Sequence, residues 1–121
     1  MRRILLKRDN NKKSTDSSTI QAWIADSYFT RLRGLLGKKQ LSDNHGLLLE
    51  GCASVHTFGM RYPLDLVFLD KSGKVIKCQK GVKPFRTASA RGAYYTLELN
   101  NGMICNQDIS ENDQYSWINK Y

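Results

Sequence analysis

The sequence is short of the features that mark secreted, disulfide-bonded and membrane-spanning proteins. Its 121 residues include three cysteines and two prolines, and no two of the cysteines form a CxxC pair. An odd number of separated cysteines argues against a disulfide framework and is typical of a reducing compartment. The mean hydropathy is −0.51, and no apolar run approaches the roughly 20 residues of a membrane-spanning helix. Ile4–Leu6 is too short for the apolar region of a secretion signal. We therefore expect a cytoplasmic protein with no membrane span.

Acidic residues are also scarce, and the resulting positive charge is unevenly spread. Lys and Arg number 19 against 11 Asp and Glu, a net charge of +8, of which residues 1–13 carry +5. Residues 9–19 contain no apolar side chain, which indicates a solvated linker or a long polar turn. We predict a basic N-terminal segment and polar linker over residues 1–18 and one globular domain over residues 19–121. Ile4–Leu6 could form a short edge strand, in which case residues 1–25 would form a hairpin with a loose loop.

A second basic stretch covers residues 71–91 and contains no acidic residue. Its cations are Lys71, Lys74, Lys77, Lys80, Lys83, Arg86 and Arg91. A spacing of three does not keep side chains on one face of a strand, so we interpret the stretch as a solvated edge strand protected by lysines. The alternative is a nucleic-acid surface formed with residues 1–13. Aromatic side chains do not alternate with the lysines, as base stacking would require, and this disfavours the alternative.

Short apolar segments separated by turn residues predict a mostly β fold. We expect a compact antiparallel β-sandwich or open barrel with one or two short helices. Leu64–Leu69 is apolar on both faces and predicts a central strand buried on both sides. The other predicted strands are Thr19–Ala25, Gly46–Glu50, Lys74–Lys80, Ala93–Leu99 and Gln114–Ile118, with a helix over Tyr28–Leu36 and one helical turn within Met103–Ile109.

Residues 51–70 contain the side chains that are most capable of catalysis or ligand binding. Cys52 and His56 are four residues apart, and so are Arg61 and Asp65. Cys52 and His56 could act as nucleophile and base if a bend brought them within hydrogen-bond reach. On an extended segment their Cα atoms would lie about 13 Å apart. The spacing matches no standard zinc pattern, so we predict no metal site. The structural alternative is a buried cysteine and a histidine satisfied by the backbone.

Asp65 is the strongest single candidate, because it interrupts an apolar strand. A buried carboxylate needs a partner, and the candidates are Arg31, Arg33 and Arg61, of which we predict Arg31. The pair would fix the predicted helix on the sheet and frame one wall of a pocket lined by His56 and Met60. The functional alternative is a ligand-binding or acid–base pair at the end of the sheet. Glu98, on the opposite face of its strand from its apolar neighbours, would join this network or lie in solvent.

Several segments together resemble one known family, the proteins with a domain of unknown function numbered 192. The most specific is Phe58–Asp70, with the sequence FGMRYPLDLVFLD. It is accompanied by Ile24–Asp26, Arg31–Leu36, Gly46–Leu48, Leu97–Leu99 and Gly102. The resemblance covers Ala22–Trp117 and implies a small β-rich sandwich with no established reaction. Gly59 replaces a tryptophan common among relatives, Asn112-Asp113 stands where a Gly-Asp turn is expected, and the Cys52–His56 element is similar to that of a subgroup.

These observations favour a non-catalytic domain that binds a small polar or anionic ligand, or a protein partner, through residues 52–65. The ligand-binding candidates are His56, Met60, Arg61, Asp65, Arg31 and Glu98. A hydrolase that uses Cys52 and His56, or Asp65, is the first alternative. A basic nucleic-acid accessory protein is the second. We expect no cofactor and a monomer.

Overall fold

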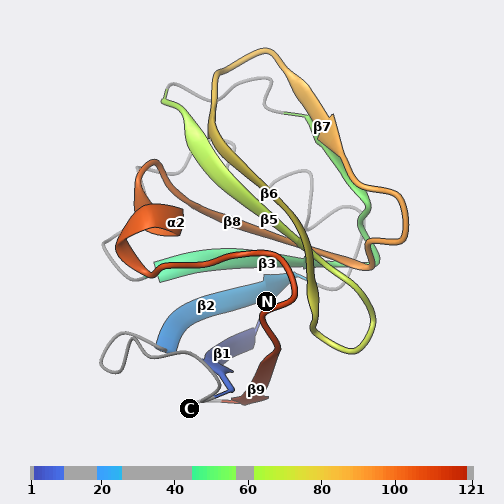
Figure 1. Ribbon diagram of the computed structural model, residues 1–121, viewed down its shortest axis with the longest axis vertical. Helices are drawn as coiled ribbons and strands as arrows, with labels where there is room; N and C mark the ends of the chain where they lie inside the picture. The colour runs from blue at the N-terminus through green and yellow to red at the C-terminus, as the bar shows by residue number, and fades with distance from the viewer. Residues whose placement is uncertain (1, 10–18, 26–44, 57–61, 120–121) are drawn as a thin grey trace.

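Nine strands and one short helix make up the described part of a computed structural model of the chain (Figure 1). The structure describes residues 2–9, 19–25, 45–56 and 62–119. The elements are β1 (Arg2–Arg8), β2 (Thr19–Ala25), β3 (His45–Glu50), β4 (Ser54–His56), β5 (Leu64–Leu69), β6 (Val75–Val82), β7 (Thr87–Ser89), β8 (Tyr95–Asn100), α2 (Met103–Asn106) and β9 (Tyr115–Asn119).

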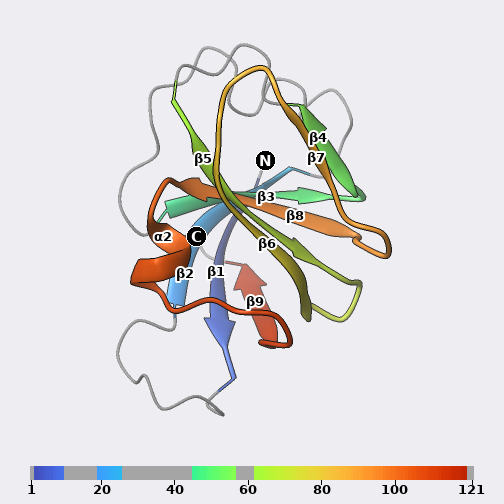
Figure 2. The same ribbon diagram turned by 45° about the horizontal axis from the view of Figure 1, so that its top comes forward.

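Seven of these strands form one sheet in the order β6-β5-β8-β3-β2-β1-β9, and β4 pairs with β7 in a separate two-stranded ribbon. Every pairing is antiparallel except that of β2 with β3. The β4–β7 ribbon and α2 lie at opposite sides of the molecule (Figures 1 and 2). The predicted mostly β, mostly antiparallel fold is confirmed. Among the described residues no helix is long and apolar enough to cross a membrane.

The two outer strands of the sheet approach each other at one end. An isolated bridge joins Lys74, just before β6, to Gln114, just before β9. The Tyr115 amide donates to the Gly73 carbonyl at 2.9 Å. Gly73 has φ +91, and a Cβ there would lie 2.2 Å from the Tyr115 carbonyl oxygen, so this approach requires glycine. The sheet is therefore rolled and open rather than a closed barrel.

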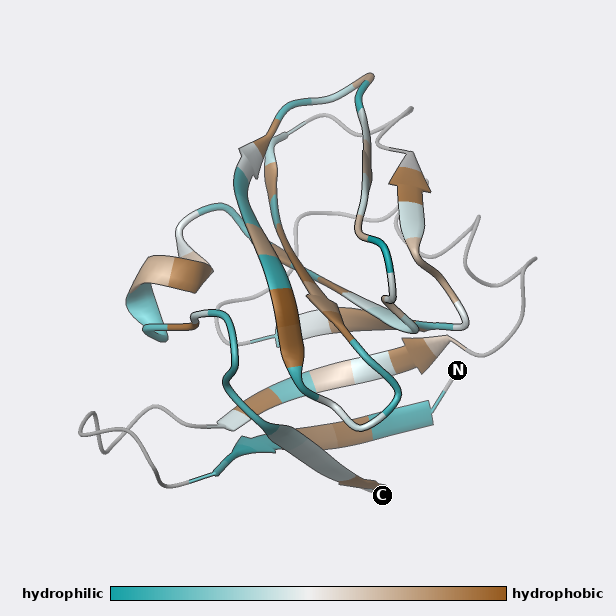
Figure 3. Cartoon of the chain, turned by 45° about the vertical axis from the view of Figure 1, so that its right-hand side comes forward, coloured by the Kyte–Doolittle hydropathy of each residue, from teal (hydrophilic) through white to brown (hydrophobic). Residues whose placement is uncertain are grey.

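Each face of the sheet buries its own apolar cluster. We call one the α2 face, because Met103 and Ile104 of α2 pack there with residues such as Val67. We call the other the β4–β7 face, because Val55 of β4 and Ala88 of β7 pack there. Side chains alternate between the faces along each strand. Apolar residues concentrate in the strands, whereas the connection from α2 to β9 is mostly hydrophilic (Figure 3).

β5 has the predicted central position. All six of its residues are buried, and it pairs with β6 on one side and β8 on the other. β6 is an outer strand of the sheet. It carries Lys77 and Lys80, which confirms the expected edge strand with lysines.

The N-terminal strand departs from the prediction. β1 pairs with β2, as the expected hairpin requires, but it also pairs with β9 and is therefore interior to the sheet. Ile4 and Leu6 belong to the cluster of the α2 face. The sheet thus begins at Arg2, before the domain boundary expected after residue 18, and the expected edge strand is wrong. The linker residues 10–18 and the predicted helix over Tyr28–Leu36 lie outside the described residues.

Candidate functional site

Asp65 lies on the α2 face of β5, where backbone amides hold its carboxylate. Its exposed fraction is 1%. One carboxylate oxygen accepts a hydrogen bond from the Gly81 amide at 2.9 Å. The other accepts from the amides of Gly102 and Ile104 at 3.0 and 2.9 Å. Gly102 is the N-cap residue of α2, so the carboxylate satisfies amides that the helix start leaves unpaired and ties the helix to the sheet.

These amides take the place of the predicted arginine. Within the described residues, no cation lies within ion-pair distance of the Asp65 carboxylate. The expected partners Arg31 and Arg61 lie outside those residues, as does Met60. Because both oxygens of Asp65 already accept hydrogen bonds, its role here is that of a structural anchor.

Glu98 lies on the other face of the sheet. On β8 it is directly opposite Leu47 of β3 and Leu66 of β5, and both leucines belong to the cluster of the β4–β7 face. Its exposed fraction is 8%, so the expectation that it joins the Asp65 network or lies in solvent is wrong. The two carboxyl groups sit on opposite sides of the sheet and do not converge.

Burial gives Glu98 an unusual protonation state. It raises the pKa of the Glu98 carboxyl from 4.5 to about 8, because ionising a carboxyl away from water is costly. In the described part of the chain no group donates a hydrogen bond to this carboxyl. At neutral pH Glu98 is therefore a protonated acid that can donate a hydrogen bond.

Three further polar side chains accompany Glu98 on this face. Tyr62 packs against the same apolar cluster, and its burial, with the nearby Glu98, raises its pKa. Thr96, two residues before Glu98, donates its hydroxyl to the Cys52 carbonyl at 2.9 Å. Leu66 of β5 pairs with Gln79 of β6 at one edge and with Glu98 of β8 at the other, so Gln79 lies on the same face as Glu98. Sequence reasoning missed Thr96 and Gln79. For Thr96 the available signal was the run of polar residues at alternate positions of β8, which does not include Gln79 on β6.

Of the predicted Cys52–His56 pair, the structure describes the Cys52 side chain and the backbone of His56. Cys52 is half-buried against the β4–β7 face, and its thiol donates to the Ser54 carbonyl at 2.8 Å. The backbone of His56 pairs with Thr87 of β7, while its side chain lies outside the description. Among the described residues no group of three or more His, Cys, Asp or Glu side chains is arranged to hold a metal ion.

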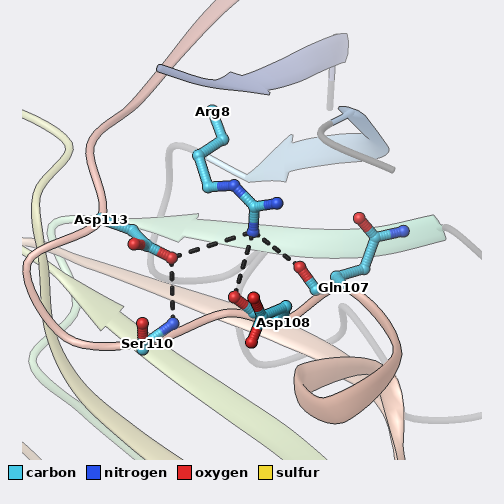
Figure 4. A network of polar contacts seen from close by, with 5 residues as sticks. All are labelled: Arg8, Gln107, Asp108, Ser110 and Asp113. Carbon is cyan, nitrogen blue, oxygen red and sulfur yellow. Dashed lines mark hydrogen bonds and ion pairs between the residues drawn. The ribbon is translucent and has the colours of Figure 1, made fainter. Parts of the chain in front are cut away.

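Arg8 anchors the N-terminal strand in a buried network (Figure 4). Its exposed fraction is 2%. One guanidinium nitrogen donates to the Gln107 carbonyl at 2.6 Å and to the Asp108 carbonyl at 3.3 Å. The same nitrogen lies 3.9 Å from a carboxylate oxygen of Asp113, which also accepts from the Ser110 amide at 3.0 Å. One cation of the predicted basic N-terminal segment is therefore structural.

The family resemblance is shown by direct comparison. The sequence model of the DUF192 family, described as "Uncharacterized ACR", matches residues 10–117 of this chain. The chain belongs to this family of uncharacterised proteins. A UPF0127 protein of Thermococcus kodakarensis is 30% identical over 100 residues, which are 78% of this chain and 62% of that protein. One from Thermococcus sibiricus is 30% identical over 112 residues, 88% of this chain and 72% of that protein. The chain thus spans about two thirds of the length of these relatives.

Two solved structures share the fold. A protein of Sinorhizobium meliloti, described as a candidate transcription regulator, has a TM-score of 0.80 at 22% identity, covering 96% of this chain and 92% of that one. A protein of unknown function from Novosphingobium aromaticivorans has a TM-score of 0.76 at 18% identity, covering 95% and 84%. At such identities the similarity establishes the architecture alone.

Proposed function

We propose that this domain binds a small, uncharged polar ligand on the β4–β7 face, with Glu98 as the central contact. The observation that carries the proposal is the largely buried Glu98 side chain, 8% exposed and next to leucines, to which no described residue donates a hydrogen bond. A ligand that accepts a hydrogen bond from the protonated acid would give this group a partner that the described part of the fold does not supply.

The predicted binding region contributes to the same face, although not through Asp65. Cys52 and Tyr62, from residues 52–65, pack against the cluster that surrounds Glu98. An anionic ligand is disfavoured there, because the desolvation that keeps Glu98 protonated acts equally on a second carboxylate. Of the predicted small polar or anionic ligands, the proposal therefore keeps the uncharged polar ones.

Binding is better supported than hydrolysis. A cysteine nucleophile needs a base within reach and a third group that orients the base. The Cys52 thiol donates to a backbone carbonyl, and the Asp65 oxygens are occupied by amides. Nucleic-acid binding through the N-terminal segment is also weakened, because Arg8 is buried and β1 is an interior strand.

An NMR titration tests the proposal. Uniformly ¹⁵N-labelled protein at pH 6.5 is titrated with a panel of small neutral amides, sugars and nucleosides. We expect at least one compound to shift the backbone amides of Leu66, Leu97 and Leu99 in a saturable way. Glu98→Leu should abolish this response, while Glu111→Leu, at an exposed glutamate, should leave it unchanged. Absence of any saturable response, or a response that survives in Glu98→Leu, would reject the proposal.

A further inference from the structure

Gln79 adds a second unsatisfied group to the face that carries Glu98. Its side-chain carbonyl oxygen is buried and has no hydrogen-bond partner. Such an oxygen requires a donor. Glu98, protonated at neutral pH, instead requires an acceptor. The two side chains therefore present complementary hydrogen-bonding groups on one face of the sheet, and that of Gln79 is buried without a partner.

The strand register places these two groups at a defined separation. Gln79 and Glu98 are both directly opposite Leu66, one on each side of β5. In an antiparallel sheet the two Cα separations at such a residue are about 4.5 and 5.5 Å, so the outer Cα atoms lie about 10 Å apart. Their side chains stand roughly perpendicular to the sheet, with the buried Leu66 between them.

One amide group matches this separation. From standard bond lengths the oxygen and nitrogen of an amide lie about 2.3 Å apart. Hydrogen bonds of about 2.7–2.9 Å at each end extend the span to about 8 Å. Small inclinations of the two side chains accommodate the remaining difference. A single hydroxyl oxygen, which accepts and donates at one atom, spans only about 5.5 Å by the same lengths.

We infer that the ligand of this site presents a carboxamide, with its carbonyl oxygen accepting from Glu98 and its N–H donating to the Gln79 carbonyl oxygen. A carboxylate has no donor for Gln79 and brings a charge into an apolar setting. An ester has the acceptor but lacks the donor. This inference rests on the proposed function, since it specifies the ligand of the same site.

A matched series of aromatic probes tests the inference. Benzamide, methyl benzoate and sodium benzoate are titrated separately into the labelled full-length protein at pH 6.5. Benzamide should bind at least about tenfold more tightly than the other two, as expected when a buried acceptor gains a donor. N-methylbenzamide forms a further arm. Equal binding of this compound would identify a peptide-type amide as the source, and weaker binding would identify a primary amide.

Two variants make the result specific to the proposed contacts. Gln79→Met keeps the length of the side chain and removes the acceptor, so benzamide should lose its advantage over methyl benzoate. Lys80→Met, at an exposed neighbour on β6, should preserve that advantage. Equal affinities for benzamide and methyl benzoate in the original protein would overturn the inference. If another compound of the neutral panel still bound through Glu98, the proposed function would stand. If no compound bound, both would fail.

Discussion

At the scale of single residues, the two buried carboxyl groups have opposite roles. Asp65 accepts hydrogen bonds from three backbone amides in two parts of the chain, Gly81 on β6 and Gly102 and Ile104 at the start of α2. Glu98 has no donor among the described residues. The first group is satisfied within the fold, whereas the second remains open to an external partner. This difference separates a structural acid from a candidate binding residue.

Asp65→Asn tests the structural role. The substitution keeps the shape but places an amide NH₂ against a backbone N–H, and it removes the charge that strengthens the remaining hydrogen bonds. We expect the free energy of unfolding to fall by about 2–4 kcal/mol, measured by urea denaturation. Glu111→Gln is the control, because Glu111 is an exposed carboxylate outside both buried networks. Equal stability of the two variants would contradict the anchoring role.

At the scale of secondary structure, the N-terminal strand holds the sheet together across a long separation in sequence. β1 lies between β2 and β9, and Arg8 at its end bonds to the loop that precedes β9. That loop also carries the bridge to the start of β6. The Arg8 network therefore supports the contact between the two outer strands of the sheet.

Arg8→Met tests this support. The variant retains much of the apolar stem but leaves Asp113 without the guanidinium, so unfolding should require about 2–4 kcal/mol less free energy. Lys7→Met, at the exposed preceding residue, should change the same quantity by no more than about 0.5 kcal/mol. Similar denaturation midpoints for both variants would show that the network adds nothing to stability.

A deletion of residues 1–13 should likewise lower the melting temperature strongly rather than by a few degrees.

The elements that sequence patterns predicted well are those whose signal is local. β5 is apolar at five of six positions, and its central placement followed from that pattern. β1 has only Ile4–Leu6 between basic residues, and nothing local indicates that β9 would pair with it. Glu98 was assigned to the correct face of β8, but its burial depends on distant segments that pack against that face. The same limit hid the amides around Asp65, since the fold rather than the sequence brings them there.

At the scale of the whole molecule, the rolled sheet separates stability from candidate function. The α2 face buries the Asp65 anchor, and the β4–β7 face carries Glu98 and Gln79. An acid that must stay protonated in the folded state should also affect the pH dependence of global stability. This effect is large enough to measure, because burial raises the pKa of Glu98 from 4.5 to about 8 and each pKa unit corresponds to about 1.4 kcal/mol.

We predict that stability falls as pH rises from about 5 to 8. Below 4.5, the ordinary pKa of glutamate, Glu98 is protonated in both states and contributes no penalty. Between that value and about 8 the unfolded chain releases the proton while the folded chain keeps it. The contribution of Glu98 to the unfolding free energy therefore decreases by about 1.4 kcal/mol per pH unit and levels off above the folded pKa. Glu98→Gln should remove this slope in denaturation series, and an unchanged slope would contradict it.

The most direct test of a protonated acid on the β4–β7 face is the titration of the Glu98 side-chain carboxyl carbon by ¹³C NMR. The resonance is assigned by its loss in Glu98→Gln and followed from pH 4 to pH 9. We predict a midpoint near 8, as burial of the carboxyl requires. A midpoint near the ordinary value of 4.5 would show that Glu98 is ionised at neutral pH and would contradict its role as the hydrogen-bond donor of the site.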